Sequence, residues 1–294
     1  MKWHITNEHD GMMIRDFLRN YLHFSRRILI SVKTEGKILV NGNPVSVREH
    51  LQAGDVLEVQ FPKEEIAGFM HPEAIDISIV YEDDALLIVN KPANMATIPS
   101  LHHPGGTVAN DLLHHYREAE LPYTVHVVTR LDRDTSGLVL IAKHRYSHSL
   151  LAKLQKSGKI KRKYKAVVEG KLAAKQGTIR APIGRKEGSI IERTVTETGK
   201  DAITHYSVLK ASERHSYIDI DLETGRTHQI RVHFSHIGHP LAGDDLYGGS
   251  TKYISRQALH CYYISFEHPF TRERVEVETE VPEDMQRLIE QMEK

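Results

Sequence analysis

The 294-residue sequence holds a single cysteine, Cys261, and it lacks any long run of apolar residues. One cysteine can form neither an internal disulfide nor a cysteine-based zinc site, and its apolar neighbours indicate a small core residue. No segment approaches the roughly 20 apolar residues of a membrane span, and the N-terminus lacks the apolar stretch of a secretory signal. A soluble, cytoplasmic protein with no membrane partner is therefore expected. Its length suggests about two domains, and 40% apolar residues suffice for a core.

Net charge is also absent, because 39 Lys and Arg balance 39 Asp and Glu. This balance would argue against a polyanionic partner only if the charges were evenly spread. Residues 143–168 carry nine bases and no acid, whereas residues 273–294 carry eight acids and three bases. A local basic field of this kind is typical of surfaces that bind phosphate backbones, and a solvated helix face is the alternative. Tyr164 within the basic run offers a ring for base stacking, which favours nucleic acid.

Residues 1–62 are predicted to form a small first domain in which two helices precede short strands. Apolar residues at 14, 17, 18 and 22 recur at helical spacing, and a second helix is expected after Ser25. A turn at residues 41–44 and the alternating pattern of residues 55–61 then indicate hairpin-like strands. The helices carry several basic side chains, among them Arg15, Arg26, Arg27 and Lys33.

This first domain resembles the alpha-L RNA-binding module of a small-subunit ribosomal protein and of many RNA-modifying enzymes. The resemblance rests on residues 14–18, 25–27 and 35–42 and on the pair Gly54-Asp55. It implies that the second helix lies against RNA phosphates, which basic side chains contact without reading the base sequence. The residues that we expect to make such contacts are Arg15, Arg26, Arg27 and Lys33. A purely structural appendage is the alternative interpretation.

A linker is predicted over residues 63–77, because they are polar, contain glycine and proline, and show no sustained period. Residues 78–294 then alternate β-rich runs, such as 85–89 and 137–142, with helical stretches such as 107–119. The sequence shows no regular βαβ rhythm, no internal repeat and no phosphate-binding glycine loop. The expected fold class of this second domain is therefore α+β and not a doubly wound sheet.

Residues 129–138, which read Thr-Arg-Leu-Asp-Arg-Asp-Thr-Ser-Gly-Leu, carry the strongest chemical signal. They place Asp132 between Arg130 and Arg133, just before a turn and a strand that looks buried. Opposite charges within a few ångströms favour a carboxylate anion, which is a nucleophile at anomeric carbons and polarised rings. A surface ion pair at the end of a loop is the competing interpretation.

The same segment resembles the active-site motif of the RluA-type RNA pseudouridine synthases, which reads His-Arg-Leu-Asp, two variable residues, then Thr-Ser-Gly. Further blocks of that family stand in the expected order at residues 90–92, 162–170, 199–206, 223–233 and 238–244. The resemblance implies an isomerase that converts uridine in structured RNA to pseudouridine. It also implies a mixed, mainly antiparallel sheet flanked by helices.

Two positions depart from the family pattern. Thr129 stands where histidine is usual, which puts any contact of that histidine with RNA or with the loop in doubt. Asn94 stands where glycine is usual, and asparagine is among the few residues that tolerate a left-handed backbone. Neither change removes a reacting group.

On this resemblance Asp132 is the catalytic aspartate. It acts on a nucleotide flipped out of the RNA, either as a nucleophile at the sugar or ring or as the base that removes the sugar C2′ proton. Tyr164 is expected to stack on the flipped base and to handle the C5 proton late in the reaction. The alternative for Tyr164 is a core tyrosine at the start of a strand.

A helix is predicted over residues 227–237, ending at a glycine, and it carries the expected partner of the aspartate. Arg231 is the ion-pair partner that orients Asp132, with Arg226 as the weaker candidate. The resemblance further implies that Ile230 packs near the flipped base and that Arg130 fills the gap that this base leaves in the RNA.

Histidine is abundant, at 20 residues, and His228, His233, His236 and His239 fall close together. A metal site is the rival interpretation of this group. Spacings of three and five suit zinc only partly, and no acid completes a His-Glu-x-x-His helix. The family uses no metal and the reaction involves no redox change, so no metal and no cofactor are expected.

Two other functions stay open at this point. A catalytically silent RNA-binding or assembly factor has the two family departures as its only support. An N-glycoside hydrolase would need a second working carboxylate, for which only Asp134 stands nearby. As for the RNA, the two-domain layout favours large-subunit ribosomal RNA, yet relatives with the same blocks modify transfer RNA. A monomer is expected.

Overall fold

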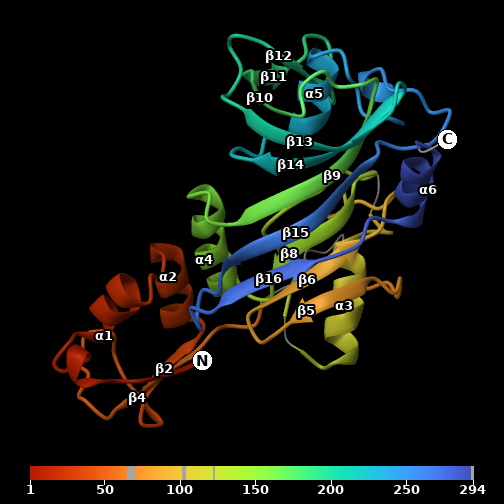
Figure 1. The fold of residues 1–294 in the computed structure, drawn as a ribbon. Helices are drawn as coiled ribbons and strands as arrows, with labels where there is room; N and C mark the ends of the chain where they lie inside the picture. Colours follow the sequence, from red (N-terminus) through yellow and green to blue (C-terminus); the bar gives the residue numbers. More distant parts are fainter. Residues whose placement is uncertain (65–69, 101–103, 122, 293–294) are drawn as a thin grey trace.

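The computed structural model describes residues 1–64, 70–100, 104–121 and 123–292. Within these residues the chain forms a small N-terminal sheet and a large second sheet, which lie side by side (Figure 1). None of the helices in the described ranges has the length and apolar character needed to cross a membrane.

The N-terminal domain is a four-stranded antiparallel sheet in the order β1-β4-β2-β3, covered by short helices. Its elements are β1 (Lys2–His4), η1 (Asn7–His9), α1 (Ile14–Asp16), the π-helical turn η2 (Phe17–Tyr21), α2 (Arg26–Thr34), β2 (Lys37–Val40), β3 (Asn43–Pro44) and β4 (Val56–Gln60). The hydroxyl of Ser25 caps α2 by accepting the backbone N–H of Ile28 at 3.2 Å. Strand β1 was not predicted, because three residues are too few to show a period.

The two sheets are joined by a packed interface that centres on Tyr146, near the start of α4 (Arg145–Lys156). Its side chain is buried, and its hydroxyl donates to the carbonyl of Leu22 at 2.6 Å. Its ring centroid lies 4.4 Å from that of Phe24 and 5.3 Å from that of Phe270. Because aromatic side chains bury large areas, this cluster holds the N-terminal domain against the second domain.

The segment expected as a linker contains no helix or strand among its described residues, but it is anchored at both ends. The carboxylate of Glu64 accepts from the backbone and guanidinium of Arg145, at 2.9 and 3.0 Å. Further along, the backbone N–H groups of Ile75 and Asp76 donate to the carboxylate of Asp111. Residues 65–69 lie outside the described ranges.

The second domain is built on a sheet of ten strands in the described residues, in the order β10-β13-β14-β9-β15-β8-β6-β5, with β16 beside β15 and β7 beside β8. The strands are β5 (Ser78–Glu82), β6 (Leu86–Lys91), β7 (His126–Val127), β8 (Ser136–Ala142), β9 (Lys161–Glu169), β10 (Gln176–Arg180), β13 (Ile203–Ala211), β14 (His215–Leu222), β15 (Leu259–Glu267) and β16 (Arg274–Glu278). Among the strands of the described ranges, β8 and β15 are the one parallel pair. The α+β prediction with a mixed, mainly antiparallel sheet is confirmed.

Helices and a small hairpin cover this sheet (Figure 1). They are α3 (Val108–Glu118), α4, α5 (Gln229–His236), η3 (Asp245–Tyr247), α6 (Glu283–Gln291) and the hairpin of β11 (Ile183–Arg185) and β12 (Arg193–Val195). Helix α3 begins at the Thr107 cap, and α5 is followed by Gly238 with a left-handed φ of 81°, close to the predicted ends. Helix α5 lies against β12 and β13, which places it opposite the loop before β8.

Gly137, at the start of β8, is expected to tolerate no side chain. Its φ is +115°, and an added Cβ would collide with the backbone of Cys261 on β15. We expect Gly137→Ala to lower the free energy of unfolding by about 3 kcal/mol or more, since backbone displacement adds to conformational strain. Gly54→Ala is the matched control, because φ is +94° there but the space is open, so it should cost only the strain. Equal losses in denaturant unfolding would contradict the prediction.

Candidate active site

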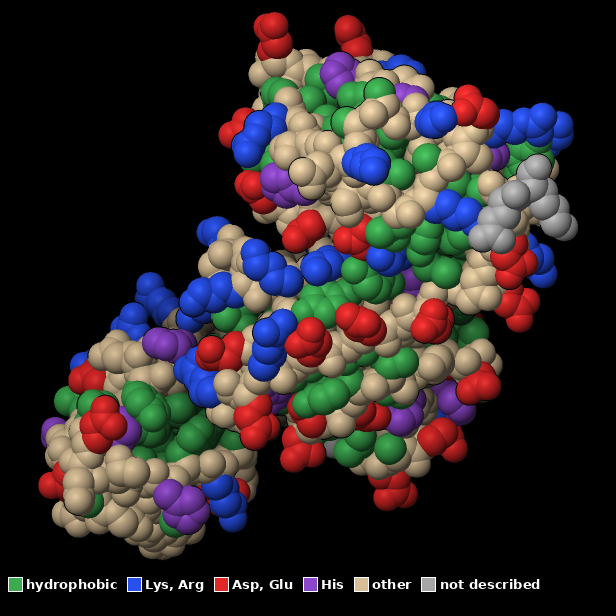
Figure 2. Space-filling model, viewed as in Figure 1, with side chains coloured by type: hydrophobic (Ala, Val, Ile, Leu, Met, Phe, Trp, Pro, Cys, Tyr) green, Lys and Arg blue, Asp and Glu red, His purple; other side chains and the backbone are tan. Residues whose placement is uncertain are grey.

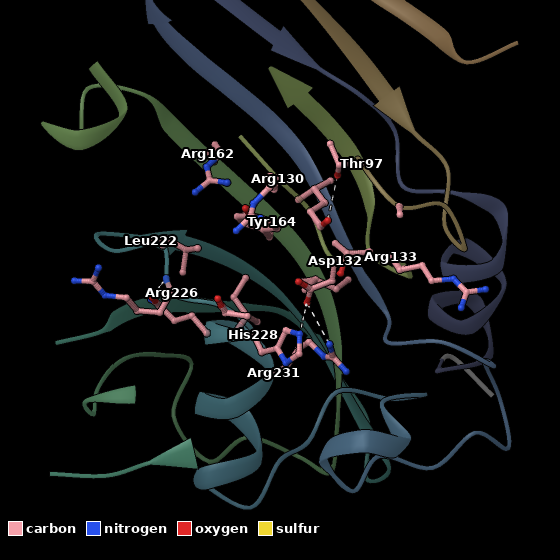
Figure 3. Close-up of a pocket in the computed structure, with 18 of the residues that line it drawn as sticks. Thr97, Arg130, Asp132, Arg133, Arg162, Tyr164, Leu222, Arg226, His228 and Arg231 are labelled. Carbon is pink, nitrogen blue, oxygen red and sulfur yellow. Dashed lines mark hydrogen bonds and ion pairs between the residues drawn. The ribbon is translucent and has the colours of Figure 1, made fainter. Parts of the chain in front are cut away.

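A pocket of about 430 Å³ opens between the loop before β8, strand β9 and the start of α5 (Figure 3). Six of the residues predicted for the site line this pocket, although they come from three distant parts of the chain. They are Asp132, Tyr164, Arg231, Arg130, Ile230 and Arg226. The other four lie exposed on the N-terminal domain, namely Arg15, Arg26, Arg27 and Lys33. The pocket has the size of a small-molecule site.

The loop that carries Asp132 is held through its backbone carbonyls. Each of the four carbonyls from residue 131 to residue 134 accepts at least one hydrogen bond. The donors are Thr97 Oγ1 to Leu131, Thr135 N to Asp132, Met95 N and Lys91 Nζ to Arg133, and Arg256 Nη1 to Asp134. Because most of these donors come from other segments, tertiary contacts hold the aspartate before any substrate arrives.

Lys91 at the end of β6 is the most buried of these donors. Its side chain is fully buried, and Nζ donates to the carbonyls of Pro92, Met95 and Arg133 at 2.8 to 2.9 Å. Burial lowers the pKa of Lys91 to about 7, while the charges of Asp134 and Asp132 oppose this shift. The lysine of the 90–92 block therefore ties β6 to the aspartate loop and has no contact with the pocket.

The aspartate is paired with Arg231 from α5. Nη1 of Arg231 donates to Oδ2 of Asp132 at 3.2 Å, while Nε and Nη2 bind both oxygens of Asp244 at 2.7 and 2.8 Å. The Asp244 side chain is fully buried. Burial by itself lowers the pKa of Arg231, but the hydrogen bonds and charge of Asp244 more than offset it, and the pKa lies above its usual value. Arg231 is thus a cation that Asp244 holds in place and that is hydrogen-bonded to Asp132.

The arginines next to Asp132 in sequence do not pair with it, contrary to what their spacing suggests. Arg130 and Arg133 are exposed, and Arg133 lies 3.8 Å from the carboxylate of Asp134. Figure 3 shows Arg133 pointing away from the pocket that Asp132 faces. The chain turns directly after Asp132, where the backbone N–H of Thr135 donates to the Asp132 carbonyl, and the charge partner of Asp132 comes from a helix 99 residues later.

Tyr164 on β9 and Ile230 on α5 form apolar parts of the wall. Tyr164 pairs with Cys261 on β15 and Ile220 on β14, and only 5% of it is exposed. Burial raises the pKa of the Tyr164 hydroxyl above its usual value, with the Arg162 guanidinium opposing, so the phenol is protonated at neutral pH. Tyr164 is therefore both a buried tyrosine and a pocket residue, and the two interpretations of it coexist.

Helix α5 begins two residues later than predicted because His228 adopts a left-handed conformation, with φ at 56°. This kink aims the His228 ring at the aspartate, and Nε2 lies 3.7 Å from Oδ2 of Asp132. His228 and Asp244 are site residues that the sequence interpretation missed. Both lie inside motif blocks already noted, at 223–233 and 238–244, but spacing alone does not show which block residues face inward.

Both departures from the family pattern are accommodated. The Thr129 side chain is buried, and its hydroxyl accepts the backbone N–H of Leu140 at 2.9 Å, outside the pocket. Asn94 has φ at 60°, so the left-handed turn that glycine usually makes is formed, as predicted. Neither residue is among those that line the pocket.

Three of the four clustered histidines have separate hydrogen-bond partners, and that of His228 is the hydroxyl of Tyr247 at 2.8 Å. His233 is buried and contacts the hydroxyl of Thr204 and the carbonyl of Ala181, each at 2.9 Å. His239 Nδ1 lies 2.8 Å from the carbonyl of Glu169. Among the residues the structure describes, no three histidine, cysteine or acidic side chains converge as metal ligands would.

Among the described residues, only some of the basic side chains in the 143–168 run are left without an acidic partner, because acids from other segments pair with the rest. The pairs are Lys143 with Glu82, Arg145 with Glu64, and Lys165 with Asp219, at 2.6, 3.0 and 2.7 Å. Lys153, Lys156, Lys159 and Lys161 are exposed on α4 and just after it. Figure 2 shows Lys and Arg side chains gathered over α2 and α4, between the N-terminal domain and the pocket.

Known proteins share this combination of domains. Residues 85–236 match the family described as RNA pseudouridylate synthase, and residues 1–57 match the RluD ribosomal pseudouridine synthase N-terminal domain. The uncharacterized RNA pseudouridine synthase YjbO of Bacillus subtilis (strain 168) is 48% identical over 91% of this chain and 95% of its own. This chain belongs to the RNA pseudouridine synthases. The ribosomal large subunit pseudouridine synthase D of Vibrio parahaemolyticus is 38% identical over 93% of this chain and 88% of its own.

Solved structures agree on the fold of this pseudouridine synthase. The human RNA pseudouridylate synthase domain containing 4 has a TM-score of 0.61 at 18% identity, covering 74% of this chain and 93% of its own. The human domain containing 1 has a TM-score of 0.59 at 24% identity, with coverage of 76% and 98%. The family match and the similar relatives make the protein an RNA-acting isomerase, and neither the silent factor nor the hydrolase is retained.

Proposed function

We propose that this pseudouridine synthase modifies uridines of large-subunit ribosomal RNA in the cytoplasm, with Asp132 as the catalytic residue. The observation that carries the assignment of Asp132 is its place in the pocket wall, on a loop held by its carbonyls and paired with the fixed cation Arg231. The similarity to proteins named for large-subunit ribosomal RNA supports the choice of substrate.

The target uridine enters the pocket by flipping out of the RNA, at a cost of a few kcal/mol that RNA contacts offset. Asp132 then breaks the glycosidic bond by attack on the nucleotide or by removal of the C2′ proton, and uracil rejoins the sugar through C5. Tyr164 stacks on the base. Because its hydroxyl is protonated, it acts in the later step as a relay, which releases its own proton to solvent as it takes up the proton that leaves C5. Ile230 packs beside the ring, and Arg130 at the pocket rim takes the place that the base has left.

The N-terminal domain supplies part of the RNA affinity in this proposal. Arg26, Arg27 and Lys33 lie exposed on α2, and Arg15 is exposed nearby with an ion pair to Asp16 at 3.4 Å. Arg226 at the pocket rim donates to the carbonyl of Asp201, which leaves its terminal nitrogens for RNA. Figure 2 shows Lys and Arg side chains gathered over both α2 and α4, so one RNA can contact both domains.

Removing charge from α2 is expected to weaken RNA binding without unfolding the protein. Each phosphate contact contributes about 0.7 to 0.9 to the slope of log affinity against log salt. We therefore expect Arg26→Gln with Arg27→Gln to reduce that slope by about 1 to 2 and to raise the Kd for a ribosomal RNA transcript about tenfold at moderate salt. Filter binding over a salt series measures both. Arg117→Gln, at an exposed position of α3, is the control, and a double variant that binds RNA as this control does would contradict the role of α2.

The substrate can be identified by mapping pseudouridines chemically in ribosomal and transfer RNA from cells with and without the gene. Loss of particular sites in large-subunit ribosomal RNA, restored by the wild-type gene and not by the Asp132→Asn gene, is the expected result. Loss confined to transfer RNA would overturn the proposed substrate, while leaving the isomerase and the role of Asp132 in place. Light scattering of the purified protein tests the expected monomer.

A further inference from the structure

His228 approaches Asp132 from the same side as Arg231 and has no role in the function proposed above. Its Nε2 lies 3.7 Å from Oδ2 of Asp132, and Nη1 of Arg231 lies 3.2 Å from the same oxygen. Figure 3 shows the two side chains converging on the carboxylate from the start of α5. In the described part of the chain, no side chain or backbone group is hydrogen-bonded to Oδ1. The two oxygens of Asp132 therefore have different surroundings.

The proton on the His228 ring is placed by a short chain of hydrogen bonds. The backbone N–H of Arg193, on β12, donates to the hydroxyl oxygen of Tyr247 at 2.9 Å, and that oxygen lies 2.8 Å from Nδ1 of His228. Nδ1 is the acceptor that the described residues place within reach of the Tyr247 hydroxyl proton, so we assign Tyr247 as the donor in this hydrogen bond. With this assignment Nδ1 accepts, and the proton of a neutral ring sits on Nε2.

The His228 ring is neutral at neutral pH. Burial lowers the pKa of His228, and the charge of Asp132 opposes this shift, but the effect of burial is the larger of the two. His228 therefore presents a neutral Nε2–H to Oδ2 of Asp132. Tyr247 also stacks under Arg231, with the guanidinium carbon 4.9 Å from the ring centroid, so one tyrosine supports both donors.

We propose that His228 is a positioning residue whose Nε2–H donates to Oδ2 of Asp132 when RNA fills the pocket, which leaves Oδ1 as the oxygen that acts on the nucleotide. This inference rests on the catalytic role proposed for Asp132. A distance of 3.7 Å is too long for a hydrogen bond, and catalytic hydrogen bonds often shorten only in the substrate complex. A neutral donor orients the carboxylate without a second full positive charge, which would weaken the anion as nucleophile or base.

The backbone at His228 makes a sharp test available. Its left-handed φ of 56° is a conformation that asparagine adopts more readily than most residues. The amide nitrogen of asparagine, however, corresponds to Nδ1 of histidine, whereas the amide nitrogen of glutamine reaches the place of Nε2. A purely structural role at this kink thus favours His228→Asn, and a donor role favours His228→Gln.

The experiment compares these two variants by single-turnover tritium release from a large-subunit ribosomal RNA transcript labelled at uridine C5. We expect His228→Asn to lower the rate constant about a hundredfold and His228→Gln about tenfold or less, with the Kd for the transcript within twofold of wild type. Tyr247→Phe keeps the ring but removes the proton donor to Nδ1, and about a tenfold loss is expected.

Other outcomes overturn the proposal. His228→Asn at the wild-type rate, or equal to or faster than His228→Gln, would leave His228 as a structural residue only. Loss of rate that follows loss of RNA affinity in both variants would make it an RNA contact. Asp132→Asn in the same assay distinguishes failure of the His228 proposal from failure of the proposed function. Full activity of Asp132→Asn would remove the proposed role of Asp132 itself. A slow Asp132→Asn beside a fast His228→Asn removes only the role of His228.

Discussion

Replacing Asp132 by asparagine is expected to abolish pseudouridine formation, with tritium release falling by about a thousandfold or more. The change keeps the size of the side chain and its hydrogen bond to Arg231, but it removes the anion that acts as nucleophile or base. The RNA affinity should stay within about twofold, because loss of a negative charge does not weaken contacts with phosphate. Single-turnover tritium release and filter binding measure the two quantities on the same transcript.

Asp134→Asn is the matched control for this experiment. It makes the same substitution two residues away in the same motif, on a side chain that lies outside the pocket and pairs with Arg133. Asp134→Asn should therefore release tritium at close to the wild-type rate. If Asp134→Asn were slow and Asp132→Asn fast, the catalytic carboxylate would be that of Asp134, and our proposal would be wrong. Free uracil from the wild-type protein would instead indicate hydrolysis.

Replacing Asp244 by alanine is expected to cost more stability than any other single ion-pair deletion in the site. Arg231 would keep a buried charge while losing the partner that binds it through two hydrogen bonds. Breaking such a buried pair lowers the free energy of unfolding by about 3 to 5 kcal/mol. Tritium release should fall as well, because Arg231 would no longer be held where it orients Asp132. Urea unfolding and single-turnover kinetics test the two effects.

Two further variants serve as comparisons for Asp244→Ala, one at the same position and one at an exposed ion pair elsewhere. Asp244→Asn retains one oxygen acceptor for Arg231, so its losses in stability and rate should lie between wild type and Asp244→Ala. Glu213→Ala removes an exposed ion pair of similar length, to Lys171 at 2.6 Å, and should leave the unfolding curve unchanged. A stable, fully active Asp244→Ala would show that Arg231 does not depend on Asp244.

Local patterns were enough to predict much of this protein. The sequence predicted a helix after Ser25 and a helical stretch over residues 107–119, which are α2 and α3, and the glycine after α5 predicted where that helix ends. The motif around Asp132 indicated the reaction class, since its residue types lie consecutively in the chain. These features depend on contacts within a few residues, so they can be read without knowledge of the fold.

The family resemblance implied that Arg231 pairs with Asp132, but residue spacing alone did not, and the other contacts of the site residues were decided by the tertiary structure. The hydrogen bond between Arg231 and Asp132 joins residues 99 positions apart, and Arg133, next to Asp132 in sequence, pairs with Asp134. The inward orientation of His228 depends on a left-handed residue at the start of α5 and on Tyr247 behind it. Sequence by itself determined which chemical groups this synthase has. The packing of β8, β9 and α5 determined which of these groups come into contact, because long-range contacts leave no period or spacing in the sequence.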